Sequence, residues 1–320
     1  MQKSFRLRCL LAAAMAALTV LAIPVVAAQT TSDSPVVREL EIRTYRNIPY
    51  YATFLTDGRE GGEVTYTVSR EPRRGTVSID GATFTYTPKA GKTGRDSFIC
   101  TATDGSGRIV EETHVSVTVI KPKSRVSYSD TAGSHAAAAA QQLAEEGVFV
   151  GAQVGGQYFF EPERVVTRGE FLAMTMEVAD LPVTAVTMTG FCDDAAIPVW
   201  AKAYAAAGLS GGVVQGSRTA EGIAFRSAAP ITFNEAAAIL DRVLSVSDVD
   251  LAQWYADRNA VPSWAAQAVA NMESVCVLSV GSFGSSELNE TVTRADAASM
   301  LCSAAALLAG ETAEHSRWPF

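Results

Sequence analysis

A threonine, an arginine and an acidic residue recur in the second half of the chain at a spacing that can do two kinds of chemistry. They are Thr167, Arg168 and Glu170 in VVTRGE, and Thr293, Arg294 and Asp296 in TVTRAD. A Thr followed three residues later by an acid is a capping box, in which both side chains bind N–H groups at the start of a helix. The arginine is not explained in this way, because a cation in the first turn opposes the helix dipole.

An arginine beside free helix N–H groups is suited to bind a carboxylate or a phosphate. The alternative for a single arginine is a solvated side chain. Because the arginine recurs at Arg294, we favour the anion site.

The pattern occurs once more between these two copies, with Thr232 and Glu235 but with Phe233 in place of the arginine. The three threonines lie 65 and 61 residues apart. A period of this size indicates three copies of one supersecondary unit. Three upstream triplets keep the same order: Tyr128-Ser129-Asp130, Phe191-Cys192-Asp193 and Tyr255-Ala256-Asp257.

We therefore predict repeats at residues 126–180, 189–246 and 253–310, each made of a helix, a loop and a second helix. The second helices begin at the repeated threonines and carry broad apolar faces, so the three units are expected to pack around them. The first helices are expected between Ser134 and Gly147, between Pro198 and Gly208, and from Pro262 to about Glu273.

The first half of the chain has the alternating pattern of β-strands. Short runs such as 83–87 and 115–119 alternate β-branched or aromatic residues with polar ones, and Asp80-Gly81 marks a tight hairpin. About seven strands over residues 35–120 predict an antiparallel Ig-like sandwich. Residues 121–125, KPKSR, are expected to be a linker.

The N-terminus has the parts of a secretory signal over residues 1–28. Basic residues precede an apolar stretch at 10–23, and small residues precede a cleavage point after Ala28. The apolar stretch is short for a transmembrane helix, so we expect export and no membrane segment after cleavage.

The chain has 320 residues and a net charge of −8, with 48% hydrophobic and 19% charged residues. This balance predicts folded domains and argues against a nucleic-acid or anionic-membrane binder. Cysteines are sparse, so isolated core thiols are favoured over a disulfide framework; Cys276 and Cys302 are the pair to consider if one forms.

Neither a metal, a cofactor nor catalysis is predicted. Asp57, Asp96 and Asp104 in the β-rich half are interpreted as turn residues, since no acidic cluster offers the six or more oxygens that calcium needs. The three histidines have no metal-ligand spacing and no nucleophile motif with them. An enzyme is therefore the least favoured interpretation.

Two resemblances add to these predictions. Residues 75–107, with the skeleton G-x-V, F-x-Y-x-P, G-x-D-x-F and D-x-x-G, resemble bacterial Ig-like or cadherin-like repeats. In the second half, the repeats share an aromatic-x-Asp opening, a Trp-Ala pair, a Gly turn, a Phe-x-Pro and a Val-Thr-Arg-x-acid signature. Repeat 1 has Phe160-Glu161-Pro162, Val166-Thr167-Arg168-Gly169-Glu170 and the turn Gly147-Val148 with Gly151. Repeat 2 has Trp200-Ala201 and the turn Gly208-Leu209 with Gly212. Repeat 3 has Trp264-Ala265 and Val292-Thr293-Arg294-Ala295-Asp296.

With these motifs in this order, residues 126–309 resemble three S-layer homology repeats. The resemblance implies an all-α pseudo-threefold bundle that holds an exported protein noncovalently on the cell wall. It implies a pyruvylated secondary wall polysaccharide as partner, bound between repeats. The site residues it implies are Thr167, Arg168, Glu170, Thr293, Arg294, Asp296, Trp200, Trp264, Asp130, Asp193, Asp257, Gly151 and Gly212.

The chain departs from the family at several positions. His135 replaces a Trp in the first repeat, Phe233 replaces the Arg in the second, and the third lacks the Gly turn. An alternative is therefore a degenerate bundle that serves as a structural or protein–protein interaction module with other surface proteins. The tryptophans also have an alternative role as core anchors. The sequence thus predicts a surface protein whose Ig-like domain is a spacer or adhesion module.

Overall fold

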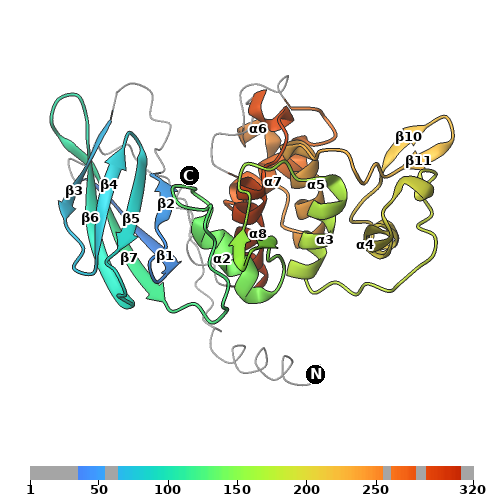
Figure 1. The fold of residues 1–320 in the computed structure, drawn as a ribbon. Helices are drawn as coiled ribbons and strands as arrows, with labels where there is room; N and C mark the ends of the chain where they lie inside the picture. Colours follow the sequence, from blue (N-terminus) through green and yellow to red (C-terminus); the bar gives the residue numbers. More distant parts are fainter. Residues whose placement is uncertain (1–34, 55–63, 255–260, 279–285, 311–320) are drawn as a thin grey trace, which may run out of the picture. The chain divides into compact units, whose positions relative to one another are not determined.

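The computed structural model describes residues 35–54, 64–254, 261–278 and 286–310. Within these ranges the chain forms a β-rich part followed by a helical part (Figure 1). None of the helices in these ranges has the length and apolar character that crossing a membrane requires. The predicted signal at 1–28 lies outside the described residues.

The β-rich part consists of two sheets. Its strands are β1 (Val36–Tyr45), β2 (Tyr50–Thr53), β3 (Thr65–Arg70), β4 (Gly75–Asp80), β5 (Thr83–Pro88), β6 (Gly94–Thr103) and β7 (Ile109–Ile120). One sheet has the order β1-β7-β6-β3 and the other has the order β2-β5-β4. The hairpin at Asp80-Gly81 is confirmed, with β4 and β5 paired in antiparallel register. The prediction of an entirely antiparallel sandwich is wrong at β1, which pairs with β7 in parallel.

The alternation in the sequence builds the core of this sandwich. In β5 the side chains of Phe84 and Tyr86 are fully buried, whereas the threonines that alternate with them are not. Phe84 meets Phe98 of β6 edge to face, with ring centroids 5.5 Å apart. Buried aromatic side chains from both sheets therefore hold the two layers together through apolar burial and ring contacts.

The helical part contains long and short elements. They are α2 (Ala137–Glu146), β8 (Ala152–Val154), β9 (Gln157–Phe159), α3 (Arg168–Val178), η1 (Asp194–Ala196), α4 (Val199–Ser210), β10 (Ser217–Thr219), β11 (Gly222–Ala224), α5 (Phe233–Leu244), α6 (Leu251–Trp254), α7 (Ala266–Ser274), η2 (Ser286–Asn289) and α8 (Arg294–Leu308). The expectation of an all-α module is wrong in one respect. The loops of the first two repeats contain the short hairpins β8–β9 and β10–β11.

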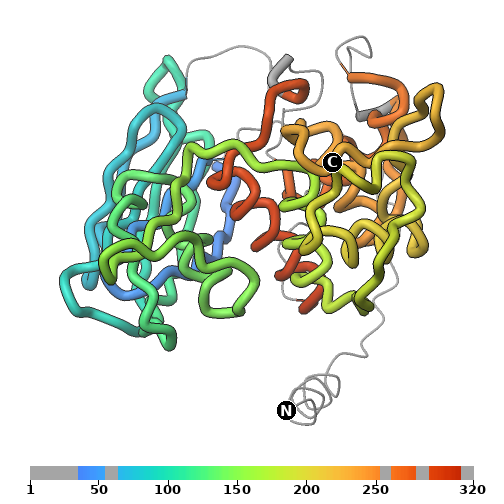
Figure 2. Tube along the Cα trace, turned by 45° about the vertical axis from the view of Figure 1, so that its right-hand side comes forward, coloured from blue at the N-terminus to red at the C-terminus, as the bar shows by residue number. Residues whose placement is uncertain are grey.

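The three second helices, α3, α5 and α8, contact one another, and each also packs against the first helix of another repeat. Helix α3 packs against α4, α5 against α7, and α8 against α2, which returns to the first repeat (Figure 2). The predicted packing around the second helices is confirmed. No repeat buries its apolar face alone, so the three must fold as one unit.

A closed ring of backbone hydrogen bonds lies where the three repeats meet. The N–H of Val166 donates to the carbonyl of Val292 at 2.9 Å, Val292 donates to Ile231 at 2.9 Å, and Ile231 donates to Val166 at 3.0 Å. These are the β-branched residues that precede the repeated threonines, and all three are buried. The ring relates the repeats by an approximate threefold arrangement.

The end of the first helix of repeat 2 differs from its prediction. We expected α4 to end at Gly208, but it continues to Ser210 and Gly211 follows it. Gly208 lies inside the helix, where an added Cβ would stand 3.2 Å from side-chain atoms of Leu172 and Val214. Its role is therefore close packing within α4 and not termination.

Candidate functional site

The three predicted capping boxes are present. Thr167, Thr232 and Thr293 accept the N–H of the acid three residues later, and that acid accepts the N–H of the threonine. For the third box the bond from the N–H of Thr293 to Asp296 is 2.9 Å. The Thr and acidic residues of the site prediction therefore have a complete structural role in starting α3, α5 and α8.

In the first and third boxes, the two N–H groups between the threonine and the acid are not free for a ligand. The N–H groups of Arg168 and Gly169 donate to the carbonyls of Ala229 and Ser227 in repeat 2. In repeat 3 the equivalent groups of Arg294 and Ala295 donate to carbonyls in the loop of repeat 1. The prediction of an anion held by open helix N–H groups is wrong, because the loop of a neighbouring repeat already satisfies them.

Arg294 connects repeat 3 to repeat 1. Its Nη1 donates to the carbonyl oxygen of Phe160 at 2.8 Å and lies 2.8 Å from the carboxylate of Glu161. Its guanidinium carbon lies 4.9 Å from the ring centroid of Phe149. The residue is 7% exposed, so Arg294 is a buried clamp between repeats.

Arg168 makes the same kind of connection from repeat 1 to repeat 2. Its Nε donates to the carbonyl of Phe225 at 3.0 Å, and its Nη1 lies 2.7 Å from Glu235. The side chain of Arg168 is 12% exposed. In repeat 2 the corresponding residue is Phe233, which packs against the apolar core.

The aspartates at the start of repeats 1 and 2 fix the loops of these repeats. Asp130 accepts the N–H groups of Phe160 and Glu161 at 2.9 and 2.7 Å. Asp193 accepts those of Phe225 and Arg226, both at 2.8 Å. Glu161 and Arg226 have positive φ angles of 55° and 58°. The carboxylates thus stabilise two unusual backbone conformations.

The third aspartate of this set, Asp257, lies outside the described residues. For the two that are described, both carboxylate oxygens already accept backbone N–H groups. Asp130 and Asp193 therefore position loops, and neither lines the groove described below.

The glycines of the first two repeats align differently from the predicted pairs. In the structure Gly147 corresponds to Gly212, and Gly151 corresponds to Gly216, since each pair has positive φ. A Cβ at Gly151 would lie 2.3 Å from a backbone oxygen, and one at Gly216 would lie 2.6 Å from Ile223. Gly216 is therefore the counterpart that the sequence prediction missed. Its signal was the G-V-x-x-G spacing, which recurs at 212–216.

In the third repeat the glycine turn is preserved without glycine. Cys276 has a φ of 56°, and Val277 donates to Met272 at 2.9 Å as Val148 donates to Leu143. This thiol is exposed, as is Cys192, so the prediction of four core cysteines is wrong for these two. Cys276 and Cys302 form no disulfide.

Both predicted tryptophans are on the surface. Trp200 is 51% exposed and Trp264 is 58% exposed, so their alternative role as core anchors is wrong. Trp264 borders a pocket of about 280 Å³ that also has walls from repeats 1 and 2. The other residues that line it are Arg168, Val214, Gln215, Gly216, Ser217, Glu235, Ala238, Ile239 and Arg242.

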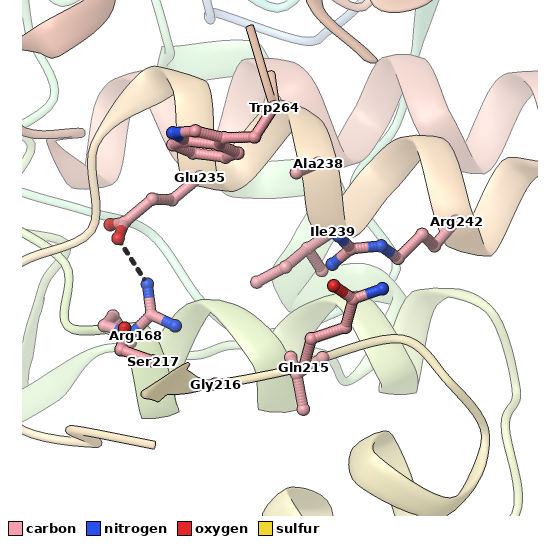
Figure 3. Close-up of a pocket in the computed structure, with 10 residues that line it drawn as sticks. Arg168, Gln215, Gly216, Ser217, Glu235, Ala238, Ile239, Arg242 and Trp264 are labelled. Atoms are coloured by element: carbon pink, nitrogen blue, oxygen red, sulfur yellow. Dashed lines mark ion pairs between the residues drawn. The ribbon is translucent and has the colours of Figure 1, made fainter. Parts of the chain in front are cut away.

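In this groove two arginines and one carboxylate surround an open space. Figure 3 shows the Arg168–Glu235 pair and the Trp264 indole on one side, with Arg242 and Gln215 on the other. Arg242 donates from Nη1 to the carbonyl of Val213 at 3.2 Å and has no ion pair with a described carboxylate. Burial lowers the pKa of its guanidinium below the usual value. A half-buried, unpaired guanidinium favours an anionic ligand.

The equivalent positions of the other repeats lack this arginine. Ten residues after the capping threonine, repeat 1 has Glu177 and repeat 3 has Ser303. Glu177 accepts the hydroxyl of Tyr204 at 2.6 Å, which raises the pKa of Tyr204 to about 12. No sequence motif marks Arg242 as a site residue. Its only signal was being the one basic residue in this register.

Metal-binding residues are not gathered anywhere in the described ranges. No group of three His, Cys, Asp or Glu side chains there is placed to hold a metal ion. Asp96 accepts the N–H groups of Arg73 and Arg74, and Asp104 accepts those of Ser106 and Arg108, in keeping with the turn interpretation. Asp57 lies outside the described residues.

Comparison with known proteins bears mainly on the β-rich part. No curated protein matches the sequence. Several solved structures align at low similarity, among them the following three. A 2,6-sialyltransferase of Photobacterium sp. JT-ISH-224 is 8% identical with a TM-score of 0.23, over 28% of this chain and 19% of that one. The endo-fucoidan hydrolases MfFcnA4 and MfFcnA9 of glycoside hydrolase family 107 follow. MfFcnA4 is 22% identical with a TM-score of 0.21, over 28% of this chain and 13% of that one. MfFcnA9 is 18% identical with a TM-score of 0.22, over 31% of this chain and 18% of that one.

The chain thus spans less than a fifth of the length of each of these structures. Among known protein families, no S-layer homology repeat is detected in the chain, so that resemblance stays a prediction. Residues 24–120 match the model of the bacterial Ig domain, and the seven strands between Val36 and Ile120 fit it. The first part of the chain is therefore a bacterial Ig-like domain.

Proposed function

We propose that the chain is an exported cell-surface protein whose helical part binds an anionic secondary wall polysaccharide without a covalent bond. The Ig-like domain acts as a spacer or adhesion module. The observation that supports this function is the groove in which Trp264, Arg168 and Arg242 surround about 280 Å³ of open space. We propose no catalytic activity, no cofactor and no nucleic-acid partner for the chain.

The chemistry of the groove fits an acidic sugar. The exposed face of Trp264 can stack on the apolar face of a pyranose ring. Arg242 offers unpaired N–H donors to a carboxylate, such as that of a pyruvyl ketal. Gly216 at the edge of the groove allows close packing of the chain, because a Cβ there would lie 2.6 Å from Ile223. With Glu235 included, the three charged groups of the groove sum to one positive charge.

Binding at one groove, and not at three, follows from the differences between repeats. The groove of Trp264 has the unpaired Arg242, whereas the equivalent position in repeat 1 is the acidic Glu177. Repeat 3 has Ser303 at the position of Arg242. Its second helix packs against the first helix of repeat 1, where His135 replaces the tryptophan. We therefore propose one polysaccharide site in the helical part of each chain.

The experiment is cosedimentation of the full chain with cell-wall sacculi, before and after chemical removal of the wall polysaccharide. Trp264→Ala and Arg242→Gln are each expected to reduce binding by about 5-fold to 150-fold, because each removes one ligand contact worth about 1–3 kcal/mol. Trp200→Ala and Arg218→Gln are the matched controls, since both side chains are exposed and lie outside the groove.

The controls should bind as the parent chain does. Equal binding by the Trp264→Ala variant and the parent would contradict the groove as the site. Binding that survives removal of the polysaccharide would contradict the ligand.

A second candidate is a structural or protein–protein interaction module that does not bind polymer. The internal bonds of Arg168 and Arg294 support it, since both side chains connect repeats. The same experiment separates the candidates. If the parent chain does not bind sacculi that retain their polysaccharide, the second candidate is the better description.

A further inference from the structure

Basic residues gather at one end of the Ig-like domain. Residues 70–96 contain six basic residues and three acidic ones. The basic residues are Arg70, Arg73, Arg74, Lys89, Lys92 and Arg95, and all six are exposed. They lie at the end of β3, the turn into β4, the turn after β5 and the start of β6 (Figure 1).

Hydrogen bonds fasten these two turns together. The carboxylate of Asp96 accepts the N–H groups of Arg73 and Arg74 at 2.9 and 2.8 Å, and also the hydroxyl of Tyr86 at 3.0 Å. Nη1 of Arg74 donates to the carbonyl of Thr93 at 2.9 Å, and Nζ of Lys89 donates to that of Arg73 at 2.9 Å. The basic side chains are therefore presented by a fixed scaffold.

The charges at this end are not neutralised by carboxylates. The side chains of Arg74 and Lys89 bond to backbone carbonyls, and Arg70 donates to the hydroxyl of Ser97 at 3.4 Å. Among the described residues, none of the six forms an ion pair. Of the three acidic residues, Asp96 lies at this end of the sheet, Glu71 lies in the same turn, and Asp80 is at the opposite end of β4. A local excess of positive charge remains in a chain whose net charge is −8.

We infer that this basic end of the Ig-like domain binds an anionic polysaccharide. The patch offers several separate cations along two turns, which suits a flexible chain with repeated carboxylate or sulfate groups. The aromatic side chains of this segment, Phe84 and Tyr86, are fully buried, so the patch has no surface on which nucleic-acid bases could stack. This site would be separate from the groove of Trp264, and it does not depend on the proposed function.

The test uses a fluorescein-labelled heparin dodecasaccharide as the probe and measures its anisotropy with the full chain at 50 mM NaCl. The variant Arg73→Gln/Lys92→Gln/Arg95→Gln removes three charges whose side chains make no hydrogen bond to described residues, while the backbone bonds to Asp96 remain. We expect at least about a tenfold loss of affinity, and a similar loss for the parent chain at 200 mM NaCl.

The matched control is Lys121→Gln/Lys123→Gln/Arg125→Gln, which changes the net charge equally but in the linker. It should retain affinity within about threefold. Trp264→Ala should also bind heparin as the parent does, which separates this site from the groove. Circular dichroism of each variant verifies that the sandwich is folded.

Three outcomes would overturn the inference. Equal losses in the patch variant and the linker variant would indicate a nonspecific effect of net charge. Tighter binding of a 30-base-pair DNA duplex than of heparin would indicate a nucleic-acid surface. Dimers of the parent chain in sedimentation velocity at low salt, abolished in the patch variant, would indicate that the patch binds a second copy.

Discussion

The role of Arg294 as a clamp between repeats 3 and 1 can be tested by Arg294→Met. Methionine keeps a long apolar side chain in the same space but removes the guanidinium. The carbonyl of Phe160 then loses its charged donor, and Phe149 loses the cation above its ring. The helical part should be destabilised, and the Ig-like domain should be unaffected.

The magnitude follows from the burial of each partner. A hydrogen bond from a charged donor to a buried carbonyl contributes about 1.5–3 kcal/mol, and a desolvated cation–π contact contributes about 1 kcal/mol. Glu161 is 47% exposed, so water can solvate its carboxylate and the ion pair adds less than about 1 kcal/mol. The free energy of unfolding should fall by about 2–4 kcal/mol.

Tryptophan fluorescence during urea unfolding is a suitable assay, because all four tryptophans follow the linker and none lies in residues 35–120. With a slope of about 2 kcal/mol per molar urea, the midpoint should move down by about 1–2 M. Glu161→Gln is the control and should shift the midpoint by less than about 0.5 M. A loss below about 0.5 kcal/mol in Arg294→Met would refute the clamp.

Two further predictions concern other contacts. Gly169→Ala should destabilise the helical part by about 1–3 kcal/mol, because the new Cβ would lie 2.3 Å from Oγ of Ser227. Adding Ser227→Ala to the same chain should restore most of the lost free energy of unfolding. Urea unfolding measures both variants, and an undiminished loss in the double variant would contradict the steric cause. His114 bonds to Glu112 and lies 3.0 Å from Glu39, which raises its pKa above the usual 6.5, so its contribution to stability is present below pH 6.5 and is lost as pH rises through the folded-state pKa. An NMR titration of His114 should give a midpoint above 6.5 that falls in Glu112→Gln; an unchanged midpoint would exclude the Glu112 bond as the cause.

The fold was largely predictable because local signals and tertiary packing agree. Alternation of β-branched or aromatic residues with polar ones located strands such as β5 and β7, and the capping boxes located the starts of α3, α5 and α8. The ends of helices were less predictable. Gly208 looks like a terminator in the sequence, yet it is needed for packing against Leu172. The parallel pairing of β1 with β7 depends on a contact about 75 residues away, which no local pattern reports.

The site was less predictable than the fold because its residues contact partners that belong to other repeats. The sequence identified Arg168 and Arg294 as residues that a capping box does not explain, which holds in the structure. It could not show that their partners are Glu235 and Glu161 from other repeats. Arg242 was missed because its importance comes from lying opposite Trp264, which is a tertiary relation.

Charge gives the two proposed binding surfaces opposite responses to salt. Residues 126–320 contain nine basic and 22 acidic residues, so an anionic polymer approaching the groove of Trp264 meets long-range repulsion around a small positive centre. Salt screens charges beyond about 8 Å at 0.15 M, so it reduces this repulsion while it barely weakens contacts inside the groove. The basic end of the Ig-like domain has the reverse balance. Adding salt from 50 to 300 mM should therefore preserve or strengthen the binding of the patch variant to sacculi, and should weaken heparin binding by the parent chain. If added salt weakens both the binding of the patch variant to sacculi and the binding of heparin by the parent chain, the acidic charge of the helical part does not oppose the polymer. The groove of Trp264 then cannot be the main site of the wall polymer.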